Sequence, residues 1–319
     1  MKLNQFFKYF FSLLSALIVL GGCSPKDESK PLRIGMNTWP GYEPLVLAKD
    51  LGYLSEKTLI SRLDSATDVV KSFKSDIIDI ACLTLDEAII LQDNSEDEIK
   101  IIAIIDFSTG GDAVIAKKDI ASMKDLRGRK IGVESSALGA FMISRAIDLT
   151  PELDRDDLTI VNIGYEHHES EFLNGNIDAV VTFEPVKTKL LQSNAHIIFD
   201  STQIPGEIVD VMIVKTKIIK EKNLEIVKLL EAWYKSVEFL SKKEEKSLKM
   251  MAEYEGISYE DFKIAYDGIK IPSLEENKEF FNSKLEDTIK KIDAILLEKY
   301  LIRGSVDPKK IYTTQYLKR

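Results

Sequence analysis

The side chains of this sequence that could do chemistry are mainly carboxylates and aromatic rings placed just after short apolar runs. Trp39 and Tyr42 stand in a Pro-Gly turn directly after the run Leu32–Met36. An aromatic ring on a stiff loop at a strand end can stack on a flat ligand or cover an alkyl group. The alternative is that Trp39 packs into its own lobe as an anchor of the loop. Both residues are therefore candidate ligand contacts.

A weak internal repeat points to two similar halves. A phenylalanine, an aspartate six residues later, an apolar run and a final acid occur in residues 73–86 and again in residues 172–184. The final acids are Asp86 and Glu184. In open α/β sheets, ligands lie outside the carboxyl ends of the strands. Two facing lobes would therefore place both acids at one cleft, unless these acids only cap the helices that follow them.

Further polar candidates follow other apolar runs. Ser135 and Ser136 open a predicted helix, and either would cap it, while its free N–H groups favour an anionic or acceptor group. Ordinary capping without a ligand is the alternative. The acids near the predicted cleft are Asp86, Asp112, Glu134, Glu184 and Asp210. So many carboxylates disfavour a doubly charged anion unless they are paired, for which Arg33 and Arg145 are candidates, and they favour a ligand with amine or amide donors.

The sequence contains no catalytic signature, so no catalytic residue, cofactor or enzyme activity is predicted. It has no Gly-x-Gly-x-x-Gly, no phosphate-binding loop and no Gly-x-Ser-x-Gly elbow. His167 and His168 invite a metal interpretation, but neighbours in an extended segment point to opposite faces, and a polar surface turn is favoured. The net charge of −9 argues against nucleic acid as a partner.

The N-terminus predicts export. Residues 1–22 combine two lysines, a short apolar run and small residues, which is typical of a signal peptide, with a short membrane anchor as the alternative. Leu20-Gly21-Gly22-Cys23 also resembles the bacterial lipobox. This resemblance implies cleavage before Cys23 and lipidation of its sulfur, with residues 23–31 as a lipidated tether. The location implied is the periplasm or the cell surface, anchored in a membrane by Cys23.

The remaining sequence predicts an α/β fold. Short apolar runs alternate with helical segments, which favours βαβ units and mainly parallel sheets. The predicted strands are 32–36, 77–83, 99–105, 113–116, 131–133, 158–163, 179–183, 196–199 and 209–214. Apolar residues spaced three and four apart predict amphipathic helices over 226–240 and 285–296. Trp233 and Cys82 are predicted to be buried.

Several motifs together resemble the nitrate/sulfonate/taurine and thiamine-pyrimidine group of ABC solute-binding proteins. The motifs are residues 33–35, Trp-Pro-Gly-Tyr at 39–42, Ala-Lys-Asp-Leu-Gly-Tyr at 48–53, 106–112, 125–134 and Val-Thr-Phe-Glu-Pro at 181–185. The resemblance implies a two-lobed periplasmic-binding-protein fold of type II. Lobe one would comprise residues 32–111 and 212–319, and lobe two residues 112–211, with hinge crossovers near Gly110–Asp112 and Asp210–Val214. Val186 departs from the aromatic residue that members of the group often carry.

The resemblance implies an extracytoplasmic protein that captures a small nitrogen- or sulfur-containing organic solute for an ABC importer. Its partners would be the solute and an ABC permease in the inner membrane, and the chain would act as a monomer. A lipoprotein that senses a ligand for a membrane receptor, or an enzyme on the same fold related to pyrimidine synthesis, are the alternatives. The predicted ligand contacts are Trp39, Tyr42, Asp86, Gly111, Asp112, Ser135, Ser136, Glu184 and Asp210.

Overall fold

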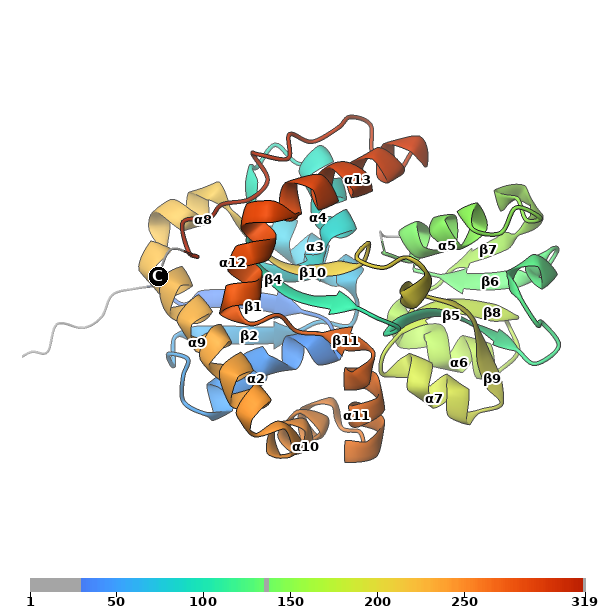
Figure 1. Ribbon diagram of the computed structural model, residues 1–319, viewed down its shortest axis with the longest axis horizontal. Coiled ribbons are helices and arrows are strands. Elements are labelled where there is room, and N and C mark those ends of the chain that lie inside the picture. The colour runs from blue at the N-terminus through green and yellow to red at the C-terminus, as the bar shows by residue number, and fades with distance from the viewer. Residues whose placement is uncertain (1–29, 135–137, 318–319) are drawn as a thin grey trace, which may run out of the picture. The chain divides into compact units, whose positions relative to one another are not determined.

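The computed structural model of the chain describes residues 30–134 and 138–317 (Figure 1). The chain from Pro31 onward forms one compact unit. Cys23, Ser135 and Ser136 lie outside the described residues, so the lipid anchor and the serine contacts stay predictions. Within the described residues, no helix combines the length and the apolar character needed to cross a membrane.

The unit contains two β-sheets. The first has the order β11-β4-β10-β3-β1-β2. Its strands are β1 (Leu32–Met36), β2 (Thr58–Arg62), β3 (Ile80–Thr84), β4 (Ile99–Ser108), β10 (Val209–Lys215) and β11 (Ile269–Lys270). The second has the order β7-β6-β8-β5-β9. Its strands are β5 (Asp112–Lys117), β6 (Lys130–Val133), β7 (Thr159–Asn162), β8 (Ala179–Phe183) and β9 (Ala195–Asp200).

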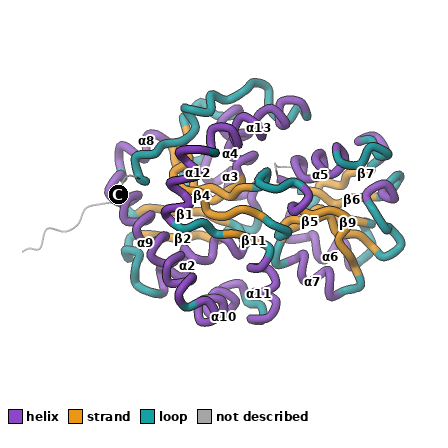
Figure 2. The backbone as a smooth tube through the Cα atoms, viewed as in Figure 1, coloured by secondary structure: helices purple, strands orange, loops and turns teal. Residues whose placement is uncertain are grey.

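Helices flank both sheets (Figure 2). They are α2 (Glu43–Asp50), α3 (Ala66–Lys74), α4 (Leu85–Asp93), α5 (Leu138–Asp148), α6 (His168–Leu173), α7 (Val186–Gln192), α8 (Thr216–Glu221), α9 (Asn223–Lys242), α10 (Glu244–Glu255), α11 (Tyr259–Asp267), α12 (Leu274–Ser283) and α13 (Leu285–Glu298). The helices predicted over 226–240 and 285–296 are confirmed as α9 and α13.

Burial on both faces explains the continuous apolar strands. In β3, Ile80 and Cys82 join the same core cluster as α9, whereas Ala81 and Leu83 join the cluster of α3, α4 and α13. Successive side chains of a strand point to opposite faces, so both faces of β3 are covered by helices. The predicted burial of Cys82 and Trp233 is confirmed, since neither side chain is exposed to solvent.

All nine predicted strands are present, and two further strands, β2 and β11, were not predicted. The strand β2 lies at the edge of its sheet and alternates only weakly between buried and exposed residues. The strand β11 has two residues. Neither gives the long apolar run by which a strand is recognised in a sequence.

The prediction of mainly parallel sheets is wrong. Among the described strands, four neighbouring pairs are parallel and five are antiparallel. The antiparallel pairs all involve β5 or β10, which follow the two connections between the sheets, or the short β11. A continuous apolar run indicates burial on both faces, but it carries no information about strand direction.

The chain crosses from the first sheet to the second through residues 109–111, close to the predicted first crossover. It returns through residues 201–208. The second crossover was predicted near Asp210–Val214; these residues pair with both β3 and β4 inside the first sheet, and the connection lies just before them. Their apolar character reflects a central strand instead of a hinge.

The internal repeat has a structural counterpart in each sheet. The backbone N–H of Asp79 donates to the carbonyl of Arg33 over 2.8 Å, and the N–H of Arg33 donates back to the Asp79 carboxylate over 2.8 Å. Asp178 and Lys130 make the same reciprocal pair, at 2.8 and 3.1 Å. Each aspartate thus fixes the start of one parallel strand beside the next.

Candidate ligand-binding site

A small cavity lies between the two sheets. Elements of the first sheet contribute Asn37, Trp39, Tyr42, Ala66, Thr84, Glu87 and Asp210 to its wall, and elements of the second contribute Asp112, Glu134, Leu138, Gly139, Met142, His168, Val181, Thr182 and Phe183. The cavity volume is about 30 Å³, which is the space of about one water molecule. A larger molecule can therefore enter only if the two sheets move apart.

Trp39 both lines the cavity and anchors its loop, so the two interpretations of this residue are not exclusive. It is 4% exposed and precedes the 3-10 turn Pro40–Tyr42. Its indole Nε1 donates to Asp106 Oδ2 over 3.0 Å. A Cβ atom added at Gly111 would lie 2.6 Å from the Trp39 ring, so the absence of a side chain at Gly111 lets the ring approach the connection between the sheets.

Tyr42 and Asp210 form a second contact at the cavity wall. The Tyr42 hydroxyl donates a hydrogen bond to Asp210 Oδ1, and both residues are buried. Burial, reinforced by the neighbouring charge of Asp106, raises the pKa of Asp210 well above its usual range. Burial likewise raises the pKa of Asp106 to about 8. Asp106 therefore holds a proton at neutral pH, and burial disfavours the charged form of Asp210.

Three other acids line the cavity and differ in how they are bonded. Glu87 accepts the backbone N–H of Thr84 over 3.1 Å and so caps α4. Glu134 accepts the Thr67 hydroxyl over 2.6 Å, which joins the end of β6 to α3. Asp112 is 2% exposed, and its Oδ2 atom has no hydrogen-bond partner. Burial raises the pKa of Asp112 to about 7.

Three predicted contacts do not line the cavity: Asp86, Gly111 and Glu184. Asp86 lies buried in the first turn of α4. Gly111 donates its N–H to the Gly268 carbonyl over 2.9 Å. The Glu184 carboxylate accepts the N–H and the hydroxyl of Thr188 over 3.1 and 3.0 Å and pairs with Lys187 over 2.7 Å. Glu184 therefore stabilises the start of α7, which agrees with the alternative that this acid caps the helix that follows it.

The predicted surface turn at the histidine pair is correct for His167 and wrong for His168. His168 is 1% exposed and lines the cavity. Its Nε2 lies 3.2 Å from the Ile163 carbonyl, which only accepts, so Nε2 carries the proton and Nδ1 accepts the Thr182 hydroxyl at 3.1 Å. Burial lowers the pKa of His168 to about 4, so its ring is neutral at neutral pH.

Several lining residues were missed: Asn37, Glu87, Leu138, Met142, His168, Thr182 and Phe183. Asn37 and Phe183 stand two positions and one position from the predicted residues Trp39 and Glu184, respectively. Strand alternation could have identified Thr182 and Phe183 as residues near a strand end. Side chains from α5, such as Leu138 and Met142, gave no signal because they fit an ordinary apolar helix face.

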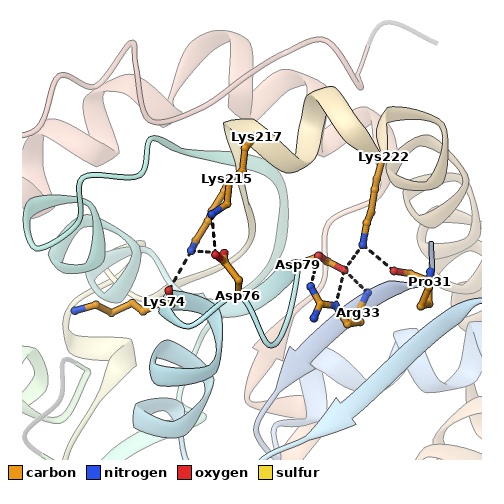
Figure 3. Close-up of polar contacts among 8 residues, drawn as sticks. All are labelled: Pro31, Arg33, Lys74, Asp76, Asp79, Lys215, Lys217 and Lys222. Atoms are coloured by element: carbon orange, nitrogen blue, oxygen red, sulfur yellow. Dashed lines mark hydrogen bonds and ion pairs between the residues drawn. The ribbon is translucent and has the colours of Figure 1, made fainter. Parts of the chain in front are cut away.

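The two arginines that were candidates to pair with the cavity acids bind elsewhere. Figure 3 shows the Arg33 side chain on Asp79, at 2.7 and 3.0 Å, together with Lys222. Arg145 binds Glu207 and Asp148, each at 2.7 Å. No lysine or arginine appears among the cavity residues that the structure describes. In the same part of the chain, no three His, Cys, Asp or Glu side chains are arranged to hold a metal ion.

Comparison with solved structures defines the class of fold. The alkanesulfonate-binding protein SsuA from Xanthomonas axonopodis pv. citri, bound to MOPS, is 14% identical, with a TM-score of 0.73 over 89% of this chain and 99% of that one. The periplasmic aliphatic sulphonate-binding protein SsuA from Escherichia coli is 17% identical, with a TM-score of 0.69 over 91% and 100%. A ligand-binding component of an ABC-type import system from Staphylococcus aureus, with zinc bound, is 11% identical, with a TM-score of 0.75 over 91% and 98%. The chain therefore has the periplasmic-binding-protein fold.

The family is shown by the sequence match. The family model described as NMT1/THI5 like matches residues 39–247, and the chain belongs to this family. The match includes all the described cavity residues except Asn37. No curated protein matches the chain.

Proposed function

We propose that this chain is an extracytoplasmic solute-binding protein that captures a small nitrogen- or sulfur-containing organic solute and delivers it to an ABC importer. The observation that carries the proposal is the cavity whose wall comes from both sheets. Within residues 30–134 and 138–317, two backbone connections join these sheets, at residues 109–111 and 201–208. A site divided in this way closes on its ligand by a hinge motion.

The two lobes of the proposal follow the two sheets. Lobe two comprises residues 112–208, so its end is shifted from residue 211 to the residue before β10, and the rest of the described chain forms lobe one. Contacts that hold the lobes together in this closed form include Thr67 with Glu134 at 2.6 Å and Gln192 with Asp261 at 2.7 Å. These bonds break and reform as the solute enters and leaves.

The position of the protein in the cell is part of the proposal. The apolar N-terminus and the Leu-Gly-Gly-Cys motif ending at Cys23 support export and lipid anchoring in the periplasm or at the cell surface. An anchored binding protein stays close to a permease in the inner membrane, to which the closed form docks as a monomer. The fold relatives named above as sulfonate-binding or import proteins support the same assignment.

Equilibrium dialysis tests the function. The full chain, purified in detergent without denaturation, is dialysed against a low-molecular-weight extract of the cells that produce it, and both compartments are compared by mass spectrometry. We expect the concentration of one solute, or of a few related solutes, to be higher on the protein side. The control is the same chain unfolded in guanidinium and dialysed at equal concentration. Equal solute levels with native and unfolded protein would contradict the proposal.

A further inference from the structure

The ionisable groups of the cavity wall are mainly acids. Four carboxyl groups line it, from Glu87, Asp112, Glu134 and Asp210, and no lysine or arginine accompanies them among the described lining residues. The only histidine among the described lining residues, His168, is neutral at neutral pH, because burial lowers the pKa of its ring to about 4, and both ring nitrogens lie within hydrogen-bond distance of protein groups. Buried carboxyl groups without a cation are costly unless something else bonds to them.

Cations near the cavity are bound elsewhere. Lys187 is the cation nearest in the chain to the cavity wall of β8, and its Nζ atom donates to the Gly110 carbonyl over 2.9 Å and pairs with Glu184 over 2.7 Å. The partners of Arg33 and Arg145 are aspartates and a glutamate away from the wall. Burial raises the pKa of Asp112, and the charge of Lys187 offsets this only in part. Lys187 is paired with Glu184 and is not among the described lining residues, so the described wall itself carries no lysine or arginine.

One acid retains an unused acceptor. Glu87, Glu134 and Asp210 each accept a hydrogen bond from the protein. Asp112 Oδ2 is fully buried and accepts none, and Asp112 belongs to the cavity wall. A buried acceptor without a donor destabilises the folded chain. A hydrogen-bond donor supplied by a ligand removes this destabilisation. Asp112 is therefore the lining acid whose hydrogen bond to a ligand contributes most to the binding free energy.

The rest of the wall is apolar and aromatic. Trp39, Tyr42 and Phe183 line the cavity, with Trp39 edge-on to Phe183, and Leu138 and Met142 add aliphatic surface. Such a wall covers a flat or apolar body. A bare metal ion does not fit it, since no three ligating side chains are arranged for one in the described residues.

We infer that the solute is a small organic cation with N–H donors, such as a protonated amine or an amidine on a flat or apolar body, whose nitrogen donates to Asp112. The inference rests on the proposed function and narrows its solute class. An alkanesulfonate does not fit this position, because its oxygens only accept hydrogen bonds and offer Asp112 Oδ2 no donor.

Dialysis of the full chain in detergent against the same cell extract at pH 7.5 gives the first test. The enriched solute is expected to carry a positive charge and at least one N–H group. Enrichment of an anion or a neutral compound would overturn the inference and leave solute binding intact. Enrichment of nothing would overturn the proposed function and this inference together.

Titration calorimetry with the enriched cation gives the second test. Asp112→Asn keeps the shape of the side chain but removes its charge, and we expect the affinity to fall about tenfold or more. The matched control is Asp119→Asn, whose side chain is 60% exposed and bonded to Arg129 on the surface; its affinity should equal that of the wild type. Unchanged affinity in Asp112→Asn would overturn the assignment of Asp112.

The number of protons released on binding is a third test, and it does not depend on whether the Asp112→Asn variant folds. The charged groups that act on Asp112 are Asp86, Glu184, Lys187, Asp106 and Asp210. Burial and the neighbouring acids favour a protonated Asp112 carboxyl group. A cation that binds to Asp112 displaces this proton. Wild-type calorimetry in two buffers of different ionisation enthalpy at pH 6.5 should show release of protons on binding. Zero release or uptake of protons would contradict the inference whatever the variant does.

Discussion

The indole of Trp39 meets the ring of Phe183 edge-on, with the ring centroids 5.9 Å apart. Trp39 follows β1 of the first sheet, and Phe183 ends β8 of the second. The same two rings line the cavity. A solute that enters between the sheets must separate this pair, so the environment of Trp39 reports directly on the site.

Trp39→Phe should remove most of the change in tryptophan fluorescence that the solute causes. The other tryptophan, Trp233, is buried in α9 and does not line the cavity, so its emission should stay constant. The variant also loses the hydrogen bond to Asp106, and the free energy of unfolding should fall by about 1–3 kcal/mol. Fluorescence titration and denaturant unfolding measure the two effects. A full solute signal in Trp39→Phe would show that Trp39 is only an anchor.

The stability of the solute-free chain should decrease from pH 5 to pH 8.5. Burial raises the pKa of Asp112 to about 7 and of Asp106 and Glu87 to about 8. The folded chain therefore binds these protons more tightly than the unfolded chain, whose acids titrate near pH 4. Their contribution is fully present below about pH 4 and is lost as the pH rises through 7–8.

Guanidinium unfolding at pH 5, 6.5 and 8.5 measures this dependence. We expect the free energy of unfolding to drop by more than about 3 kcal/mol across the range, since each pH unit over which one acid is protonated only in the folded chain contributes about 1.4 kcal/mol, and by less in Asp112→Asn. Below pH 4 the sign reverses, since hydrogen bonds from Arg33 and Arg145 lower the pKa of Asp79 and Glu207 despite burial. Stability that increased between pH 5 and 8.5 would contradict the burial of protonated acids at the cavity.

The two repeated aspartates should differ in their effect on stability. Asp79 is 1% exposed and binds both Arg33 and the buried Lys222 (Figure 3). Asp178 is 25% exposed and binds Lys117 over 3.2 Å. Asp79→Ala leaves a buried ammonium unpaired, which costs about 3–5 kcal/mol. Asp178→Ala should cost roughly 1 kcal/mol. Equal losses in chemical denaturation would mean that Lys222 gains water when Asp79 is removed.

Cys23→Ser should release the protein from the membrane fraction, because no other residue of the motif can accept a lipid. Cell fractionation in high salt, followed by immunoblotting, measures the distribution. Cys82→Ser is the control, since Cys82 is a buried core residue. If Cys23→Ser remains in the membrane fraction, the N-terminus is a membrane anchor and the lipobox assignment is incorrect.

The sequence predicted strands better than it predicted which acids face the cavity. Asp86 and Glu87 are neighbours in the first turn of α4, so they point about 100° apart around the helix. Five consecutive residues of this helix, Leu85–Ile89, are buried, so the hydrophobic pattern does not reveal which side faces the cavity. Glu87 faces it and Asp86 does not.

The aromatic loop was predictable for a different reason. The turn Pro40–Tyr42 begins four residues after the end of β1, and proline and glycine fix its geometry locally. Tyr42 and Asp210 come from segments far apart in the sequence, and only the packing of β10 between β3 and β4 brings them together. His168 was misjudged because a histidine next to a second histidine and two glutamates looks polar, although its ring is bonded inside the second sheet.

The central claim is that one solute contacts both sheets at once, and paired substitutions test it most directly. Asn37→Ser changes the wall near β1, and Phe183→Leu changes the wall at the end of β8; both residues line the cavity. Calorimetric titration of each variant with the solute found by dialysis should give an affinity about fivefold or more below that of the wild type, which corresponds to about 1 kcal/mol. Asp119→Asn should bind like the wild type. Weaker binding in both wall variants would support the account, and unchanged affinity in either one would contradict it.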